Sequence, residues 1–313
     1  MAPPEKGKAL NERGIAAMAR ADYVNAERLF RESVQIWQSL GPVFELHLAT
    51  GQINVGDALC GEGRWIEGAA LFEQSLQTNR RLLGTGNLRT LANMTRLANV
   101  YLVIGKPELS EPLYREALAV QREHPVDDIQ LVRTLEGIAA LHMREGQLDV
   151  AMPEAEEALR IASTSIGENT AEAALAYASV GEIYRISGRS DRALPLLRKG
   201  RSMLEQIVGP NHPRVAAILS QEGLALMREG KLAMAEQALV RSVNILSAIP
   251  GATVELAVSE HNLGLLRVRQ KKYNDADGLL TRALALEEKY SLPNGNETLA
   301  TRQVLDEVRK NLR

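Results

Sequence analysis

The sequence is poor in several kinds of residue that mark particular protein classes. Aromatic residues make up only 4% of the 313 residues, and Cys60 is the single cysteine. One cysteine excludes an internal disulfide and a metal site built from paired cysteines. The N-terminus lacks the apolar stretch of a signal peptide, and no run of about 18 apolar residues follows that would span a bilayer. We therefore expect a cytoplasmic protein without a membrane partner, and a core of aliphatic residues and alanine.

The charges of the chain are nearly balanced. Lys and Arg number 37 against 39 Asp and Glu, which gives a formal net charge of -2 at pH 7. A nucleic-acid-binding domain usually has a marked excess of positive charge, so we expect no nucleic-acid partner. The content of 45% hydrophobic and 24% charged residues is typical of a soluble folded protein.

A repeat of 41 or 42 residues runs through almost the whole chain. Small residues mark it at Gly14, Gly56, Ala98, Ala139, Gly181, Gly223 and Gly264. Twelve residues after each marker, and again nineteen after it, every repeat has Gly, Ala or Ser. The residues sixteen after the markers are mostly large and apolar: Phe30, Phe72, Tyr114, Ala155, Leu197, Leu239 and Leu280. The residues seven after the markers are mostly glycine: Ala21, Gly63, Gly105, Gly146, Gly188, Gly230 and Lys271.

These spacings predict a pair of helices in each repeat. The offsets of twelve, sixteen and nineteen fall on one face of a helix, because residues three and four apart are helix neighbours. Small residues beside a bulky one let this second helix, B, pack closely against the first helix, A, which carries the marker. The glycine at offset seven suits the turn between them, where a C-cap needs positive φ. Neither helix buries its apolar face alone, so stacked repeats are expected to bury it together.

The pattern of small marker, glycine turn, small, large apolar and small residues resembles the tetratricopeptide repeat, in the 42-residue form of kinesin light chains and many bacterial proteins. The stretch from Gly209 to Ala216 looks like the linker of that form. The resemblance implies an all-α, right-handed superhelical solenoid of seven helix-turn-helix repeats with a C-terminal capping helix. We expect one domain over 1–313, with repeats at about 8–42, 43–84, 85–125, 126–168, 169–210, 211–251 and 252–295, and the cap at 297–312. Four apolar residues of the cap are expected to cover the open end of the stack: Leu299, Leu305, Val308 and Leu312.

No motif for catalysis or for a cofactor stands out. The stretch Gly84 to Arg89 begins like a dinucleotide-binding loop, but Arg89 occupies the place of the third glycine and no strand precedes it. It falls at a repeat junction, where a linker is expected. The five histidines are dispersed, and two of them, His124 and His212, precede a proline, which is a turn signal. We therefore expect no enzyme activity, no cofactor and no metal.

The resemblance implies that the A helices line a concave groove that holds a partner protein or peptide. Counting from the markers predicts a largely polar groove surface. Its residues are Asn54, Asp57, Arg96, Asn99, Arg133, Glu136, Arg144, Glu182, Gln221, Arg228, Asn262 and Arg269. Arginine recurs five residues after the marker in three repeats, at Arg144, Arg228 and Arg269, which predicts a basic stripe able to pair with carboxylates of a peptide. The alternative interpretation is that these are ordinary solvated positions on a helix.

Other functions stay open at this point. Asn54 and Arg96 match the carboxylate clamp of co-chaperone repeats, but Asn11, Ala92 and Ile15 occupy its other three positions and do not match. A protein-binding scaffold is the leading hypothesis. A regulatory sensor that binds a signalling peptide or small molecule and changes its superhelical shape is the alternative. A monomer is expected, with self-association through an end repeat as a further alternative.

Overall fold

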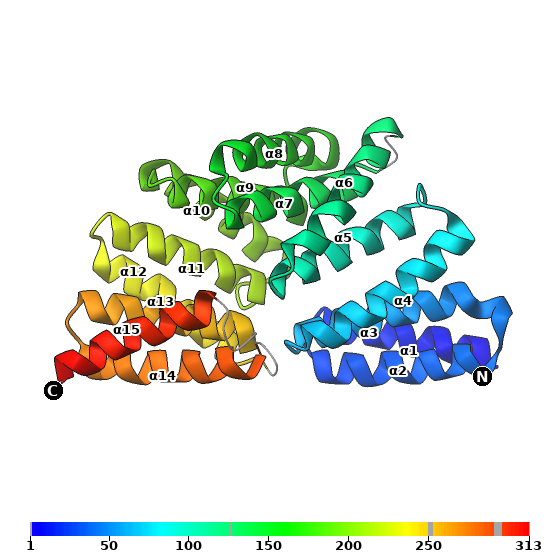
Figure 1. Cartoon of the computed structure of the whole chain (residues 1–313), viewed down its shortest axis with the longest axis horizontal. Helices are drawn as coiled ribbons and strands as arrows, with labels where there is room; N and C mark the ends of the chain where they lie inside the picture. The colour runs from blue at the N-terminus through cyan, green and yellow to red at the C-terminus, as the bar shows by residue number, and fades with distance from the viewer. Residues whose placement is uncertain (1, 125–126, 250–252, 291–295, 313) are drawn as a thin grey trace. The chain divides into compact units, whose positions relative to one another are not determined.

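Helices account for the regular structure of this chain. The computed structural model describes residues 2–124, 127–249, 253–290 and 296–312, and no strand occurs among them. The A helices are α1 (Pro3–Met18), α3 (Glu45–Gly61), α5 (Leu88–Val103), α7 (Asp128–Arg144), α9 (Ala171–Ile186), α11 (Pro213–Arg228) and α13 (Thr253–Arg269). The B helices are α2 (Tyr23–Ser39), α4 (Trp65–Leu83), α6 (Pro107–Glu123), α8 (Leu148–Ile161), α10 (Ser190–Val208), α12 (Leu232–Ser247) and α14 (Tyr273–Tyr290), and α15 (Asn296–Leu312) follows them (Figure 1). The predicted all-α solenoid of seven helix pairs and a final helix is confirmed.

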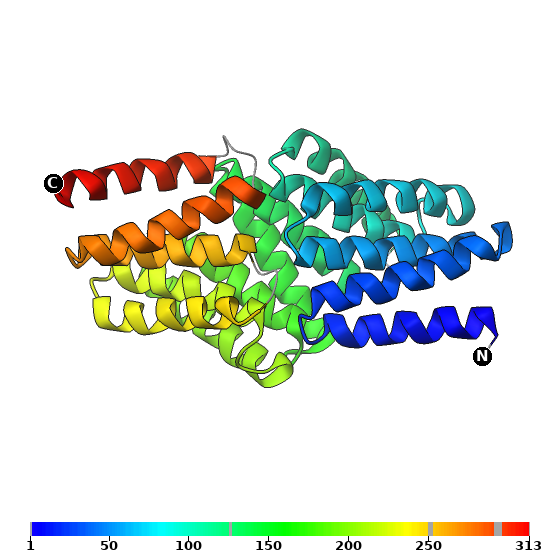
Figure 2. The same cartoon turned by 90° about the horizontal axis from the view of Figure 1, so that it is seen from below.

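The chain divides into two compact units. Unit 1 covers Met1–Leu141 and unit 2 covers His142–Arg313, so that the boundary lies within α7. From α1 to α6 in unit 1, and from α8 to α15 in unit 2, helices that follow one another in the chain pack side by side (Figures 1 and 2). The single domain expected from the sequence stays a prediction.

The turns between A and B helices share one backbone conformation. The residue seven after the marker has positive φ in all seven repeats, for example 78° at Gly63 and 74° at Gly230. Ala21 and Lys271 adopt the same conformation, with φ of 56° and 60°, although they have side chains. Left-handed backbone costs a residue with a Cβ roughly 1–2 kcal/mol relative to its usual conformation. The first and last turns therefore hold strain that the five glycine turns avoid.

The marker and the residue sixteen after it face one another inside each hairpin. A Cβ added to Gly56 would lie 2.7 Å from the ring of Phe72, and one added to Gly223 would lie 2.5 Å from the side chain of Leu239. Phe72 and Leu239 are themselves 1% and 0% exposed. A small residue on helix A thus leaves the space that the large residue of helix B fills.

The small residues nineteen after the marker sit against the backbone of helix A. The hydroxyl of Ser242 donates to the carbonyl of Ala216 at 2.7 Å, and a Cβ on Gly200 would collide with the equivalent carbonyl, that of Ala174. This column is therefore small because the two backbones approach closely there.

The linkers between repeats begin with glycine and end with a helix cap. Gly84 ends α4 with φ of 80°, and the side chain of Asn87 accepts a hydrogen bond from the amide of Arg89 at the start of α5. Gly209 ends α10 in the same way, and His212 caps α11. The Gly84 to Arg89 stretch is thus a linker, as its position in the repeat predicted.

The final helix buries a different set of residues from the one expected. Leu305 and Val308 are 2% and 1% exposed, as predicted, but Leu299 and Leu312 are 41% and 43% exposed, so the prediction was wrong for these two. The inner face of α15 is completed by two threonines, Thr298 and Thr301, both 0% exposed. The hydroxyl of Thr301 bonds to Nδ1 of His261 and to a carboxylate oxygen of Glu287. These polar partners on α13 and α14 favour threonine at position 301, whereas the spacing of apolar residues alone had predicted that leucines form the buried face.

Candidate binding surface

The predicted partner-binding residues lie on the A helices, and within each unit side chains link several of the consecutive A helices. We use the name A-face of unit 1 for Asn11, Asn54, Asp57, Arg96, Asn99, Arg133 and Glu136. We call a side-chain pair that joins consecutive A helices a rung. Asn54 on α3 donates to the side chain of Asn11 on α1 at 2.6 Å. The guanidinium of Arg96 on α5 donates to Asp57 on α3 at 3.3 Å.

The Asp57–Arg96 rung is balanced in charge. Both side chains are about one-third exposed, at 34% and 37%. Burial raises the pKa of Asp57, and the positive charges of Arg96 and, more weakly, Arg133 oppose that rise. One carboxylate thus meets one bonded guanidinium, with a second cation close by.

The remaining predicted residues of unit 1 are partly engaged within the chain. The side-chain oxygen of Asn99 accepts a hydrogen bond from the hydroxyl of Tyr114. Asn99 and Arg133 are exposed, and Glu136 is half-buried. The A-face of unit 1 is therefore polar and open to solvent at several positions.

Unit 2 repeats the same rung with a different partner. We use the name A-face of unit 2 for Arg144, Glu182, Arg185, Gln221, Arg228, Asn262 and Arg269. Glu182 follows its marker by one residue, as Asp57 does, and Gln221 precedes the next marker by two, as Arg96 does. Nε2 of Gln221 donates to Glu182 at 2.9 Å. The rung therefore has an uncharged amide where unit 1 has a guanidinium.

Arg185 on α9 was missed by the sequence reasoning. Its side chain is only 20% exposed, and its nearest carboxylate oxygen, on Glu182, is 3.7 Å away, which is too long for a hydrogen bond. The buried Nε of Arg185 has no hydrogen-bond partner among the described residues. Burial lowers the pKa of Arg185, against the attraction of Glu182.

A signal for Arg185 was present in the repeat columns. The residues four after the marker are apolar or cysteine in the other six repeats: Met18, Cys60, Leu102, Met143, Met227 and Val268. Arg185 is the charged exception in a column that otherwise faces the packed interior.

The three arginines predicted to form a stripe are exposed, but they are not equivalent. The guanidinium of Arg228 on α11 lies against the turn of the preceding repeat, since a Cβ on Gly188 would be 2.8 Å from its Nη2. Arg269 on α13 donates to the carbonyl of Met227 at 2.7 Å, which binds it to the end of α11. The positive charge of Arg144 acts on a neighbouring carboxylate, that of Glu182.

The structure therefore brings some predicted residues together and buries another. In unit 2, Glu182 interacts with Arg144, Arg185 and Gln221, and the charge of Arg228 acts on Arg185. Asn262 is only 7% exposed and donates to the hydroxyl of Ser220 at 2.8 Å. The binding role of all twelve predicted residues stays a prediction.

A family model matches the chain four times. It is the model of the tetratricopeptide repeat, and it matches residues 47–123, 130–206, 172–248 and 214–289. These ranges cover more than half of the sequence. The chain belongs to the tetratricopeptide repeat family.

Known tetratricopeptide repeat proteins resemble this chain over much of its length. The protein KINESIN LIGHT CHAIN-RELATED 1 of Arabidopsis thaliana is 25% identical over 219 residues, which are 69% of this chain and 35% of that protein. The chain thus spans about a third of the length of this relative. Two solved structures share the fold: NprR in complex with its cognate peptide NprX, and a Rap protein complexed with competence and sporulation factor. Their TM-scores are 0.68 and 0.64 and their identities 15% and 16%; the matches cover 97% and 91% of this chain and 87% and 80% of theirs.

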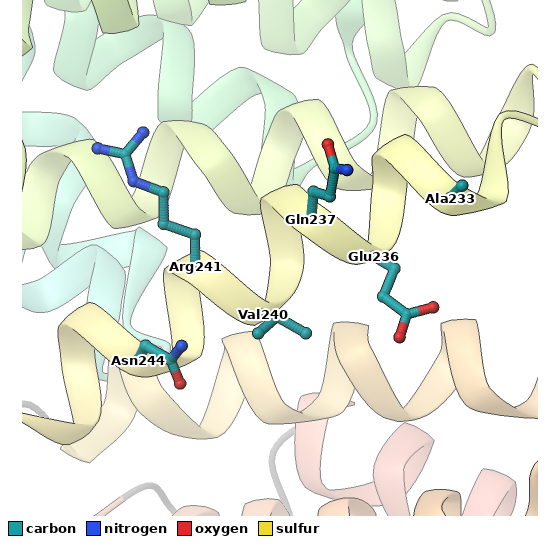
Figure 3. A pocket seen from close by; sticks show the side chains of 6 residues that line it. All are labelled: Ala233, Glu236, Gln237, Val240, Arg241 and Asn244. Carbon is teal, nitrogen blue, oxygen red and sulfur yellow. The ribbon is translucent and has the colours of Figure 1, made fainter.

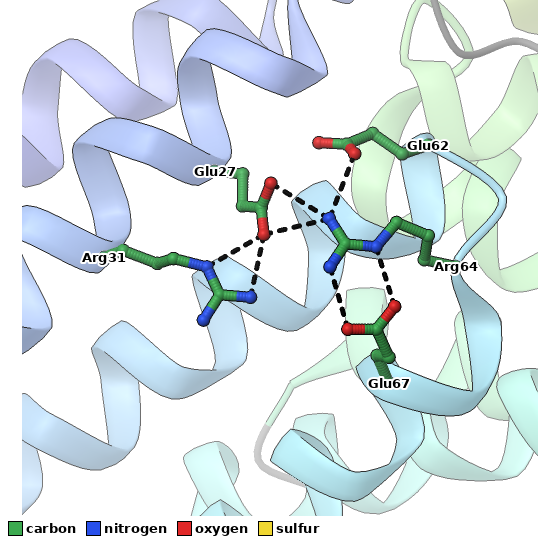
Figure 4. A network of polar contacts seen from close by, with 5 residues as sticks. All are labelled: Glu27, Arg31, Glu62, Arg64 and Glu67. Atoms are coloured by element: carbon green, nitrogen blue, oxygen red, sulfur yellow. Dashed lines mark hydrogen bonds and ion pairs between the residues drawn. The ribbon is translucent and has the colours of Figure 1, made fainter.

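Another charged cluster on this tetratricopeptide array is paired within the chain. Arg64 contacts three carboxylates, those of Glu27, Glu62 and Glu67, while Glu27 also pairs with Arg31 (Figure 4). The hydrogen bond to Glu67 is the main reason why the pKa of Arg64 is raised. This network ties α2 to the turn between α3 and α4 and to the first turn of α4, and each of its arginines is paired with a carboxylate.

A shallow depression lies on the surface of α12. Its lining consists of Ala233, Glu236, Gln237, Val240, Arg241 and Asn244, all from one helix (Figure 3). Glu236 already accepts from Gln270 and pairs with Arg267, and Arg241 pairs with Glu205. Its charged groups are therefore used in packing of the tetratricopeptide hairpins.

The described part of the chain contains neither a cluster of metal-ligating side chains nor a membrane-spanning helix. Among the described residues, no group of three or more His, Cys, Asp or Glu side chains is arranged to hold a metal ion. No helix in the described parts of the chain is both long and apolar enough to cross a bilayer.

Proposed function

We propose that this chain is a protein-binding scaffold without enzyme activity of its own, and that its A-faces receive a partner peptide or helix. The observation that carries the proposal is the exposure of Arg228 and its lack of bonding partners among the described residues. It is exposed on the A-face of unit 2, and it makes no hydrogen bond or ion pair with any residue that the structure describes. On the same face, Gln221 donates to Glu182 and Arg269 donates to the carbonyl of Met227, so donors of Arg228 remain for a partner.

The polar character of the two A-faces supports a peptide rather than an apolar ligand. Exposed Asn99 and half-buried Gln221 have amide groups that match the backbone N–H and C=O groups of an extended chain. Exposed guanidinium groups add charge-assisted hydrogen bonds. The likeness in fold to NprR and Rap, two proteins solved with bound peptides, is consistent with this proposal.

Capture from a lysate of the source cells tests the proposal. Wild type is compared with an Arg144→Glu, Arg228→Glu variant, and with an Arg160→Glu, Lys310→Glu control that changes the net charge equally at exposed positions away from the A-faces. Circular dichroism checks that all three fold alike. We expect one protein to be retained by wild type and by the control, and lost by the A-face variant.

Two other results would count against this function. Equal retention of the same protein by all three chains would place binding outside the A-face of unit 2. If nothing is retained by any of them, the sensor hypothesis replaces the scaffold. That alternative predicts that an added signalling peptide or small molecule compacts the chain in small-angle X-ray scattering.

A further inference from the structure

The turn between α9 and α10 in unit 2 has more positive charge than the chain neutralises there. Arg189 and Arg192 are exposed, and the side chain of neither forms an ion pair or a hydrogen bond within the described parts of the chain. The carboxylate of this turn, that of Asp191, is also exposed and takes part in no described ion pair. Two guanidinium groups thus lie near one carboxylate that pairs with neither of them.

The ring of Tyr184 on α9 holds both guanidinium groups in place. The Cζ atom of Arg189 is 4.9 Å from the centre of this ring, and that of Arg192 is 5.9 Å from it. A cation at such a distance is attracted by the negative charge on the face of the ring. The attraction orders two long side chains but does not supply their N–H groups with an acceptor oxygen. Tyr184 therefore preorganises two sets of donors for a ligand.

Arg228 on α11 brings a third guanidinium group to the same turn. A Cβ on Gly188 would be 2.8 Å from Nη2 of Arg228, so this guanidinium lies against the residue that precedes Arg189. Its positive charge also acts on Arg185 at the end of α9. The side chain of Arg228 is exposed and has no hydrogen bond or ion pair with any described residue. Three guanidinium groups that no described carboxylate neutralises are therefore gathered at one turn.

Ser190, at the start of α10, is small where the other repeats are bulky. The residues nine after the markers are otherwise Tyr23, Trp65, Pro107, Leu148, Leu232 and Tyr273. A Cβ on Gly61, five after the next marker, would be 2.4 Å from the ring of Tyr23, so these two offsets face one another across neighbouring repeats. Arg228 has the same offset as Gly61. A serine at position 190 thus leaves room for the long side chain of Arg228.

The hydroxyl of Ser190 adds a polar group that the chain does not use. Ser190 is 5% exposed, and its Oγ has no hydrogen-bond partner among the described residues. A buried hydroxyl without a partner costs stability, and an acceptor oxygen of a ligand would remove that cost. The first turn of a helix, where Ser190 lies, also favours a negative charge.

We infer that Arg189, Arg192 and Arg228 form a phosphate-binding site at the turn between α9 and α10, which anchors a phosphorylated side chain of the bound partner. A phosphate group has three acceptor oxygens and nearly two negative charges at pH 7, so it can engage several guanidinium groups at once. A carboxylate has two oxygens and a single charge, and would leave part of the cluster unneutralised. This inference rests on the proposed function, and it adds the chemistry of the ligand and a site at the edge of the A-face of unit 2.

Selection from a peptide library tests the site. Dodecapeptides with random residues on both sides of a fixed phosphoserine, a fixed serine or a fixed glutamate are selected on wild type. We expect the phosphoserine library to give the tightest binders. By fluorescence anisotropy, the best phosphopeptide should bind about tenfold or more tightly than its serine form, and clearly more tightly than its glutamate form. Inorganic phosphate should compete with it only weakly, because it lacks the flanking residues.

A matched pair of double variants assigns the effect to this turn. Arg189→Gln, Arg192→Gln should lose most of the preference for phosphoserine, while its binding of the serine form changes little. The control Arg160→Gln, Arg214→Gln removes the same charge from two exposed arginines that form no described ion pair, and should keep the preference. All four positions are exposed, so both variants are expected to fold, and circular dichroism with a thermal melt checks this.

Tyr184→Leu tests the role of the ring separately from that of the charges. Leucine occupies this place in the second and sixth repeats, at Leu59 and Leu226, so the variant should pack well. Tyr184 is a positioning residue, because it acts through the two arginines. Its loss should weaken binding of the phosphoserine peptide severalfold and leave binding of the serine form unchanged, which a general loss of structure would not do.

The results that overturn the inference differ from those that overturn the proposed function. A phosphoserine preference that is absent, equalled by glutamate, or retained by Arg189→Gln, Arg192→Gln refutes the phosphate site. In each of these cases the selected peptides still support a peptide-binding A-face. Inorganic phosphate that competes as well as the peptide itself refutes the partner as the source of the phosphate. No selected peptide from any library refutes both the site and the proposed function.

Discussion

Units 1 and 2 are built from the same kind of helical hairpin, but they differ in the residues that pack inside the hairpins and in the side-chain pairs on the A-faces. In unit 1 the residue sixteen after the marker, on the B helix, is aromatic, at Phe30, Phe72 and Tyr114, whereas unit 2 has alanine at Ala155 and leucine at Leu197, Leu239 and Leu280. On the A-face, unit 1 pairs Asp57 with a guanidinium, and unit 2 pairs Glu182 with an amide. The repeat backbone therefore sets where a side chain goes and leaves its chemistry free.

Removal of the large core residue from each unit is expected to have the largest effect. Phe72→Ala should reduce the free energy of unfolding by about 3–5 kcal/mol and Leu239→Ala by about 2–5 kcal/mol, because each leaves a cavity opposite a glycine that cannot fill it. Native-state hydrogen exchange locates the loss. We expect each variant to lose protection mainly in its own unit, since stability in repeat proteins depends on nearest neighbours. Equal loss throughout the chain would mean that the two units unfold as one.

The turns test a feature that both units share. Gly63→Ala and Gly230→Ala should each lower the free energy of unfolding by about 1–2 kcal/mol, since both turns have positive φ. Ala21→Gly in unit 1 and Lys271→Gly in unit 2 should raise it by up to about 1 kcal/mol, because glycine relieves the strain but is more flexible when unfolded. Urea denaturation measures all four. A loss of stability in both Ala21→Gly and Lys271→Gly would show that their side chains contribute more than the strain costs.

Exchanging the partner residues of the two rungs, Asp57–Arg96 and Glu182–Gln221, is expected to have the smallest effect on stability. It tests whether the charge of the partner residue distinguishes the two A-faces. Arg96→Gln gives unit 1 the neutral partner of unit 2, and it should raise the pKa of Asp57 further, because burial then acts without the nearest counter-charge. A higher pKa of Asp57 in the folded protein lowers the free energy of unfolding at pH values above that pKa. It has no effect at a pH where Asp57 is protonated in both the folded and the unfolded chain. The loss at pH 7 should stay below about 1 kcal/mol, since the pair is one-third exposed. Gln221→Arg should lower the pKa of Glu182.

Carbon-detected NMR titration of the two carboxyl groups measures these shifts. Thr301, on α15, is outside both rungs, and Thr301→Ser serves as a control that keeps the hydroxyl. An unchanged pKa of Asp57 in Arg96→Gln would show that the rung does not set the charge state of this face.

The repeat, the helix pairs, the glycine turns and the close approach of small residues were predictable from the sequence alone, because these features depend on spacings of a few residues along one chain. The sequence also located the A helices that contribute the candidate site. The folded structure was needed to show which side chains meet across repeats, because those contacts join residues about forty positions apart, such as Glu182 and Gln221. It showed that α15 packs through Thr298 and Thr301 instead of Leu299 and Leu312, since His261 and Glu287 supply polar partners for Thr301. It likewise revealed Arg185 as a buried cation with an incomplete ion pair, because the nearest carboxylate is held by an amide from the next helix.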